Sequence, residues 1–277
     1  MHHGTSRTSK PPPAQSVTGR LKTVLALAFL PLLAAAPVSA EPEAASWPSG
    51  RCETVRFGGA RYTVCGFDPQ VHDIRLFHRD RDGVGFRDFA ALETFLDSAD
   101  LQLIFAMNAG MYHADRDPVG LYVEQGIERK PVNQNEGSGN FHLLPNGIFY
   151  LVGNEAGVLE TQAYLTSGIR PDYATQSGPM LVIDGRLHPR FLPDGTSRKI
   201  RNGVGIAGDG RTIVFALSED RVNFHDFGRL FRDRFGAENA LYFDGSISRL
   251  HLSDLARSDP GRAMGPIVAV VAEKPAP

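Results

Sequence analysis

Short β-rich segments separated by turn signals run through most of the 277-residue chain. Three of the turn signals are the pairs Asn146-Gly147, Asp184-Gly185 and Asp209-Gly210. Such pairs favour tight hairpin turns, because both residues readily adopt a positive φ. Strands that are joined by hairpins lie antiparallel, so the pattern predicts a sheet that is largely antiparallel or mixed.

Helical periodicity is confined to two segments, Phe86 to Ala99 and Phe224 to Phe235. Asn223 precedes the second segment, and Asp226 follows three residues later, so we expect Asn223 to cap that helix. Two helices among many strands predict an α+β fold with at least two packed helices. The expected strands are 61–67, 73–78, 101–107, 120–124, 141–144, 147–152, 179–183, 204–207, 212–217, 241–243 and 267–272.

The first forty residues have the layout of a secretory signal. They carry four basic side chains and no acidic one, followed by an apolar run over 23–37 and the small residues Val38-Ser-Ala40. We expect cleavage after Ala40, export to the periplasm or beyond the cell, and a flexible lead-in over 41–50 that is rich in proline and small polar residues. The apolar run is short and interrupted by proline, so a stable membrane span is not expected after cleavage. An uncleaved anchor is the alternative.

Charge limits the classes of partner. The whole chain has 29 basic and 31 acidic side chains, and loss of the four basic ones in the signal leaves a net charge of −6. A mildly acidic surface argues against nucleic acid and anionic membranes as partners. The length of the mature chain suits one domain with a substantial core. We expect a monomer or a weak oligomer.

The two cysteines, Cys52 and Cys65, flank a Gly58-Gly59 pair. In an exported chain they predict a disulfide that joins two strands across that turn. A loop of this length contributes about 3 kcal/mol in the chain-entropy model. A redox or metal pair is the alternative, but close spacing and neighbouring histidines are both missing.

Four segments end in glycine and small polar residues, a pattern typical of strands that form the floor of a binding site. Asp244 is the most informative residue of the four segments, because this carboxylate follows the apolar run Ala240 to Phe243 and precedes Gly245 and Ser246. The four segments are Phe105 to Gly110, Thr175 to Pro179, Arg201 to Gly205, and Tyr242 to Ser246.

Each of the other three segments offers a candidate ligand-binding group and also has a plain structural interpretation. Arg201 can hold a phosphate or carboxylate through two parallel hydrogen bonds, or belong to a solvated basic turn. Ser177 and Gly178 offer a hydroxyl and free amides to an anion, or form an ordinary turn. Asn108, which precedes Gly110, can contact a ligand or cap a loop.

Metal and cofactor sites are not expected. The histidines are scattered without metal-ligand spacing, and no phosphate loop or dinucleotide fingerprint occurs. Asp115 and Asp117 lie close together but lack the glycine and distal glutamate of a calcium loop, so we interpret them as part of a polar loop.

Taken together, the four motifs resemble the phosphodiester glycosidase family in order and approximate spacing, over about residues 100 to 273. They are Asn108-Ala-Gly-Met-Tyr112, Ser177-Gly-Pro-Met-Leu181 followed by Asp184-Gly185, Arg201-Asn-Gly-Val-Gly205, and Asp244-Gly-Ser246. The family pattern typically has Asn-Gly-Gly and Asp-Gly-Gly-Gly-Ser at the first and last motifs. This chain lacks some of those glycines, which bears on the sugar it accepts.

The resemblance implies a catalytic domain over 51–273 that cleaves a carbohydrate phosphodiester on the sugar side without a cofactor. Arg201, with Ser177, Gly178 and neighbouring strand-end amides, would hold the phosphodiester. Asp244 would act as base, stabiliser or nucleophile toward the oxocarbenium-like carbon. Asn108 would orient the substrate. Further candidate binding residues are Gly110, Ser246 and Glu124, the last being a possible second carboxylate or an exposed strand-end glutamate.

Two rival hypotheses belong to other classes. The first is a phosphodiesterase that cleaves the P–O bond, although such enzymes commonly use paired metal ions. The second is a non-catalytic protein that binds glycan phosphates on the same scaffold, because a fold does not guarantee its chemistry.

Overall fold

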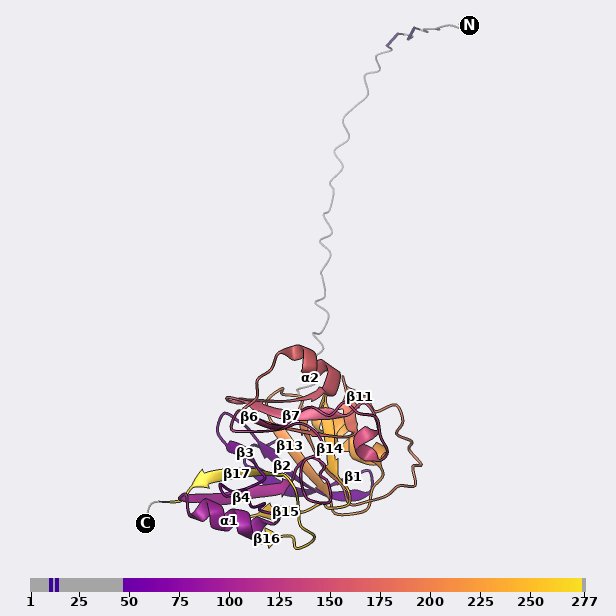
Figure 1. The fold of residues 1–277 in the computed structure, drawn as a ribbon. Coiled ribbons are helices and arrows are strands. Elements are labelled where there is room, and N and C mark those ends of the chain that lie inside the picture. The colour runs from indigo at the N-terminus through magenta and orange to yellow at the C-terminus, as the bar shows by residue number, and fades with distance from the viewer. Residues whose placement is uncertain (1–9, 12, 15–46, 276–277) are drawn as a thin grey trace, which may run out of the picture. The chain divides into compact units, whose positions relative to one another are not determined.

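The computed structural model describes residues 10–11, 13–14 and 47–275 (Figure 1). The expected signal segment and most of the expected lead-in lie outside the residues that can be described. The described residues 47–275 lie in one compact unit. The described strands are β1 (Arg51–Phe57), β2 (Ala60–Phe67), β3 (Asp73–Phe77), β4 (Leu101–Asn108), β5 (Tyr122–Glu124), β6 (Ile127–Lys130), β7 (Gly147–Val152), β8 (Glu155–Glu160), β9 (Tyr173–Ser177), β10 (Met180–Ile183), β11 (Arg186–Leu187), β12 (Asn202–Ile206), β13 (Ile213–Ser218), β14 (Ala240–Asp244), β15 (Leu250–Leu252), β16 (Arg257–Ser258) and β17 (Ile267–Glu273).

The strands form three sheets in which every pairing is antiparallel. The seven-stranded sheet has the order β1-β2-β13-β12-β14-β10-β11, and the two five-stranded sheets have the orders β16-β15-β4-β17-β3 and β6-β5-β9-β7-β8. Asp184 and Gly185 both have positive φ in the β10–β11 hairpin, as the turn signal predicts. The α+β prediction with a largely antiparallel sheet is therefore confirmed.

The main core lies where the three sheets meet. Phe215 of β13, Phe105 of β4 and Phe149 of β7 each come from a different sheet, and all three are buried. The ring centroids of Phe105 and Phe215 are 5.0 Å apart, and those of Phe149 and Phe215 are 5.9 Å apart. Burial of each phenylalanine contributes about 2 to 3 kcal/mol to the free energy of unfolding. The packing of these three rings therefore holds the three sheets together.

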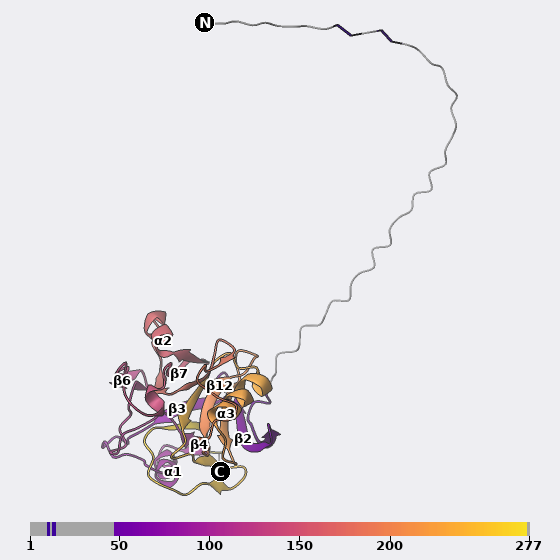
Figure 2. The same ribbon diagram turned by 90° about the vertical axis from the view of Figure 1, so that its right-hand side faces the viewer.

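Two of the helices pack on outer faces of the sheets, as the periodicity predicts. Helix α1 (Phe89–Asp97) lies beside β4 in Figure 1 and buries Phe89, Leu92 and Leu96. Helix α3 (Phe224–Arg229) continues into a π-helical turn, η2 (Leu230–Arg234), and lies alongside β12 in Figure 2. The Asn223 side chain accepts from the Asp226 amide at 2.8 Å, so the predicted cap is confirmed.

Local structure departs from the prediction at several places. The Asn146-Gly147 pair precedes β7 without forming a hairpin turn, since neither residue has a positive φ, and β6, β8, β15 and β16 were not expected. Residues 141–144 do not form a strand, because η1 (Asn140–His142) is a 3-10 turn that buries Phe141. Helix α2 (Thr161–Ser167) was not predicted, and Figure 1 shows it at the edge of the molecule. Only Thr161 of α2 is buried, so the segment carries no apolar stripe from which periodicity could reveal it.

The end of the expected lead-in belongs to the packed structure. Trp47 is buried, and its ring centroid lies 5.3 Å from that of Phe235 in an edge-on contact. The Gly50 amide donates to the Gly66 carbonyl at 2.8 Å. Residues 47–50 are therefore held by a buried indole and a backbone bond.

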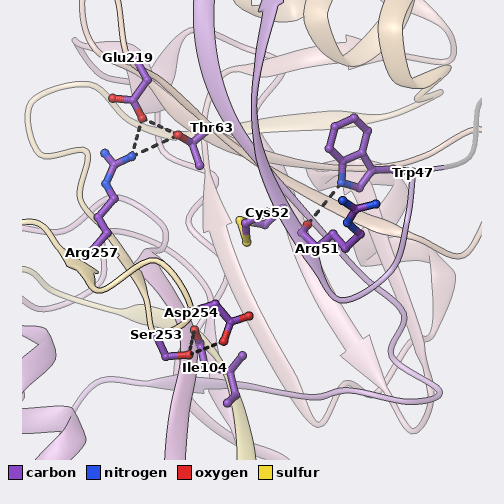
Figure 3. The surroundings of a disulfide bond; sticks show 10 residues. Trp47, Arg51, Cys52, Thr63, Ile104, Glu219, Ser253, Asp254 and Arg257 are labelled. Atoms are coloured by element: carbon purple, nitrogen blue, oxygen red, sulfur yellow. Dashed lines mark hydrogen bonds and ion pairs between the residues drawn. A yellow bond between two sulfur atoms is a disulfide. The ribbon is translucent and has the colours of Figure 1, made fainter.

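Cys52 and Cys65 form the predicted disulfide (Figure 3). They are directly paired in the β1–β2 hairpin, with their Cα atoms 4.1 Å apart, and Gly58 and Gly59 form its turn with positive φ. Figure 3 also shows Arg257 bonded to Glu219, the residue after β13. The Arg257 Nη1 atom donates to Glu219 Oε1 at 2.6 Å. The disulfide joins two strands at the edge of the seven-stranded sheet.

Replacing both cysteines with alanine is expected to lower the free energy of unfolding by about 3 kcal/mol, because the unfolded chain gains conformational freedom. Urea denaturation followed by circular dichroism measures this change. The parent protein with its disulfide chemically reduced serves as the matched control and should unfold at a similarly lowered urea concentration. Equal midpoints for the oxidised parent and the double variant would contradict the prediction.

Candidate active site

Asp244 lies at the end of β14, where the chain leaves the sheet in a tight turn. Its Oδ1 atom accepts from the Gly245 amide and, at 2.7 Å, from the Ser246 amide. Burial raises the pKa of Asp244 above its ordinary value, although hydrogen bonds from the turn amides act in the opposite direction. The turn therefore holds a half-buried carboxylate in a fixed orientation.

Asn202, at the start of β12, is the direct partner of Asp244 across the sheet. Its Oδ1 accepts from the Asp244 amide at 3.0 Å, and its Nδ2 donates to the Asn108 carbonyl at 2.8 Å. The side chain is fully buried. Asn202 therefore connects the sheet that contains β14 to the sheet that contains β4. The sequence alone did not indicate this structural role.

The carboxamide of Asn108 is also fully buried and bonded within the protein. Its Oδ1 accepts from the Arg249 amide at 3.0 Å, and its Nδ2 lies 3.4 Å from Asn202 Oδ1. Ser248 Oγ donates to the Asp244 carbonyl at 3.1 Å. Both ends of the segment from Asp244 to Arg249 are thus fixed by the two asparagines, and Asn108 reaches Asp244 through Asn202.

Ser177 lies at the end of β9, next to the last residues of β14. Its hydroxyl is fully buried and donates to the Phe243 carbonyl at 3.0 Å. Gly178 follows at a position where an added Cβ atom would lie 2.7 Å from the Cβ atom of Asn146. The pair therefore packs against β14 and the loop before β7, and it positions the strand that carries Asp244.

Arg201 is almost fully buried, with 1% of its surface exposed. Its Nε donates to the Val222 carbonyl at 3.0 Å and its Nη2 to the Ser197 carbonyl at 2.7 Å. The guanidinium carbon lies 3.6 Å from the centroid of the Phe224 ring and 5.3 Å from that of Tyr242. Burial lowers the pKa of Arg201. Among the described residues its Nη1 atom has no partner at good hydrogen-bond geometry, and the neighbouring Tyr242 hydroxyl favours the charged form of Arg201 against the effect of burial.

Tyr242 lies between this arginine and the Asp244 turn. Its hydroxyl is buried, and a Cβ atom added to Gly245 would lie 2.1 Å from it. Burial raises the pKa of Tyr242, and the charge of Asp244 raises it further. Arg201 therefore belongs to a cationic and aromatic layer beneath the turn, rather than to its solvent-facing side.

Tyr112 is a further residue near Asp244, on the loop between β4 and β5. Burial raises the pKa of its hydroxyl, with a smaller contribution from the charge of Asp244. Ser246 is exposed beside the carboxylate. Gly110, on the same loop as Tyr112, has a φ of +46°, and an added Cβ atom would lie 2.2 Å from Thr175 Oγ1, so this glycine permits close packing of the loop on β9.

Glu124 lies apart from this group. Strand β5 runs antiparallel to β9 with Val123 opposite Ala174, so Glu124 is at the end of the pair that is remote from Ser177. Its Oε2 accepts from the Tyr122 hydroxyl at 2.9 Å. The structure thus brings Asn108, Ser177 and Asp244 together through short hydrogen-bonded links, with Arg201 beneath them, and places Glu124 elsewhere.

The described part of the chain contains no group of three histidine, cysteine, aspartate or glutamate side chains placed to hold a metal ion. It also contains no helix that is both long and apolar enough to cross a membrane.

The region that contains the Asn108, Ser177, Arg201 and Asp244 motifs matches a known family. The family described as phosphodiester glycosidase matches residues 102–270. The chain belongs to the phosphodiester glycosidase family. It is 36% identical over 237 residues to the uncharacterized protein YigE of Escherichia coli (strain K12), covering 85% of this chain and 87% of that protein.

A solved structure shows the same fold. It is the catalytic domain of zebrafish N-acetylglucosamine-1-phosphodiester alpha-N-acetylglucosaminidase, auto-inhibited by its pro-peptide. The TM-score is 0.50 at 14% identity, and the match covers 82% of this chain and 86% of that one. Membership of the phosphodiester glycosidase family and this shared fold agree with the resemblance of the four sequence motifs.

Proposed function

We propose that this member of the phosphodiester glycosidase family is an exported hydrolase that cleaves a glycosyl phosphodiester on its sugar side. The products are a free sugar and a phosphomonoester. The observation that carries the proposal is the rigid Asp244 turn within the region that matches the family. Asp244 is oriented by two backbone amides and by Asn202 at the end of a buried strand.

In this reaction the bond between the anomeric carbon and the phosphate oxygen breaks, and a water oxygen becomes bonded to the carbon. A phosphodiester is a competent leaving group, so strong protonation by a general acid is not required. Asp244 acts on the developing positive charge at the anomeric carbon, as base for water, as nucleophile or as stabiliser. Its raised pKa reflects a poorly solvated carboxylate, which interacts more strongly with such a charge than a fully hydrated one does.

Arg201 supports the same step from beneath the turn. Its guanidinium is buried, so its charge is weakly screened by water. That charge favours the anionic phosphate as it leaves the sugar. Ser246 is exposed beside Asp244 and is the side chain of the turn that can contact substrate directly.

Export is part of the proposal. The Cys52–Cys65 disulfide suits an oxidising compartment, and the first forty residues have the pattern of a secretory signal. The substrate is then a carbohydrate phosphodiester of the periplasm or of the cell exterior.

Isotope labelling tests the reaction directly. The purified protein is incubated with N-acetylglucosamine 1-(methyl phosphate) in water enriched in oxygen-18, and the products are analysed by mass spectrometry. Methyl phosphate without oxygen-18 is the expected result, because water then attacks carbon; the free sugar is not diagnostic, since its anomeric oxygen exchanges with water. Oxygen-18 in the phosphate would show P–O cleavage and overturn the proposal. Saturable binding without any turnover of this and related diesters would favour a glycan-binding protein instead.

A further inference from the structure

A separate cavity of about 440 Å³ lies beside β5 and β6, and Glu124 is among the residues that line it. Its volume is within the range of small-molecule binding sites. Arg81, Arg129 and Lys130 also line it, and none of them forms an ion pair with another described residue. A cavity with unpaired cations can bind an anionic group.

The acidic side chains of the cavity offset only part of its positive charge. Arg79 donates to Asp117 Oδ1 at 2.6 Å, so these two residues neutralise each other. Asp80 Oδ1 accepts from the Val84 amide at 2.8 Å and keeps its negative charge. Asp80 and Glu124 face the three cations Arg81, Arg129 and Lys130, so the lining keeps an excess of one positive charge.

Glu124 gives the cavity an acceptor beside its donors. Its Oε2 bonds the buried Tyr122 hydroxyl, which leaves its other oxygen outside this bond. Burial raises the pKa of Glu124, while the charge of Arg129 acts in the opposite direction. Carboxylate oxygens accept from sugar hydroxyls, and guanidinium groups hold phosphate through two parallel bonds. The two kinds of group together fit a sugar that carries a phosphate.

A second cavity adjoins this one at the loop between β4 and β5. Lys130 lines both cavities, and the second, of about 430 Å³, also contains Asn133, Gln134 and His113. His113 directly follows Tyr112, whose pKa is raised in part by the charge of Asp244. The amide side chains of this second cavity suit the hydroxyl groups of a carbohydrate.

We propose that the cavity lined by Arg81, Arg129 and Glu124 binds a second glycosyl phosphate unit of the same substrate molecule. The inference rests on the proposed function, since it places the scissile phosphodiester at Asp244 and a further repeat in the cavity. The substrate class is then an oligomer or polymer of sugars joined by phosphodiesters, rather than a single capped sugar phosphate.

The test compares one short and one long substrate with matched charge variants. The short substrate is N-acetylglucosamine 1-(methyl phosphate), and the long one is a synthetic tetramer of glycosyl 1-phosphate repeats of the same sugar. R81A/R129A removes two cations of the cavity. R170A/R186A removes two exposed arginines elsewhere and controls for net charge. R81A/R129A is expected to lower kcat/KM for the tetramer about tenfold and to leave that for the short substrate unchanged.

Binding measurements keep the test independent of turnover. In a D244N background, isothermal titration calorimetry should show tighter binding of the tetramer than of the short substrate, and R81A/R129A should abolish that difference. Equal affinity for both substrates, or equal effects of the two double variants on the tetramer, would overturn the inference while leaving the cleavage reaction intact. Failure of the parent protein to cleave either substrate would instead count against the proposed function, and tighter tetramer binding through the cavity would still support the second site.

Discussion

Replacing Asp244 with asparagine will reduce turnover of a sugar 1-phosphodiester by about 10³-fold, because the carboxylate charge and basicity are lost at the reacting carbon. The asparagine side chain keeps an oxygen that can accept from the Gly245 and Ser246 amides, so the turn should keep its shape. Steady-state kinetics of the purified variant measure the loss. D254N, at an exposed carboxylate on the β15–β16 connection, is the matched control and should retain parental activity.

Comparing D244N with the parent over a range of pH, in both stability and kcat/KM, tests whether the Asp244 carboxylate takes part in catalysis. Burial raises the pKa of Asp244 above its ordinary value of 3.8, so the native protein retains a proton that the unfolded chain has already released. The free energy of unfolding contributed by this group therefore decreases as pH rises from 3.8 through the native pKa. Parental kcat/KM should increase over the same pH range as the carboxylate ionises. D244N should lose both dependences, and an acidic limb that persists in its residual activity would assign the limb to another group.

The N202A substitution is expected to lower the free energy of unfolding by about 3 kcal/mol, as much as loss of the disulfide. It leaves the Asn108 carbonyl and the Asp244 amide without their present partners in a buried environment. Urea denaturation followed by tryptophan fluorescence, which reports on the buried Trp47, measures the change. N154A, at an exposed position in the β7–β8 turn, should unfold like the parent.

Activity measurements complete this prediction. Below its unfolding transition, N202A should show a lower kcat, because Asp244 and the segment up to Arg249 lose the bond that orients them. An unchanged kcat with reduced stability would make Asn202 purely structural. An unchanged denaturation midpoint would contradict the hydrogen-bond network itself.

Features set by local sequence were predicted well. The turn pairs Asp184-Gly185 and Asp209-Gly210 lie between antiparallel strands as expected, whereas Asn146-Gly147 does not. The Cys52–Cys65 disulfide follows from the spacing around Gly58-Gly59, and Asn223 caps its helix. In each case the interacting residues are close in the chain, so their geometry follows from local conformational preference. The strand ends that meet at Asp244 also followed from glycine-rich motifs.

Contacts between distant segments were not predictable in the same way. Asn202 and Asn108 are separated by 94 positions, and their bond exists only because two sheets meet at this point. The sequence around Arg201 shows a cation beside other cations, but its burial depends on the Phe224 ring that α3 places over it. Glu124 ends a strand as Asn108, Ser177 and Asp244 do, and only the strand pairing shows that it lies away from Asp244.

The close approach of Gly245 to the Tyr242 hydroxyl limits how the specificity of this protein can be changed. Any side chain at position 245 would displace the tyrosine and, with it, the layer that contains Arg201. Variation among relatives, and libraries built for new sugars, should therefore be sought at Ser246 and Tyr112, which border the carboxylate without supporting it from below. In protein engineering, Gly245 should therefore be left unchanged, and substitutions should be placed at the residues on either side of the turn.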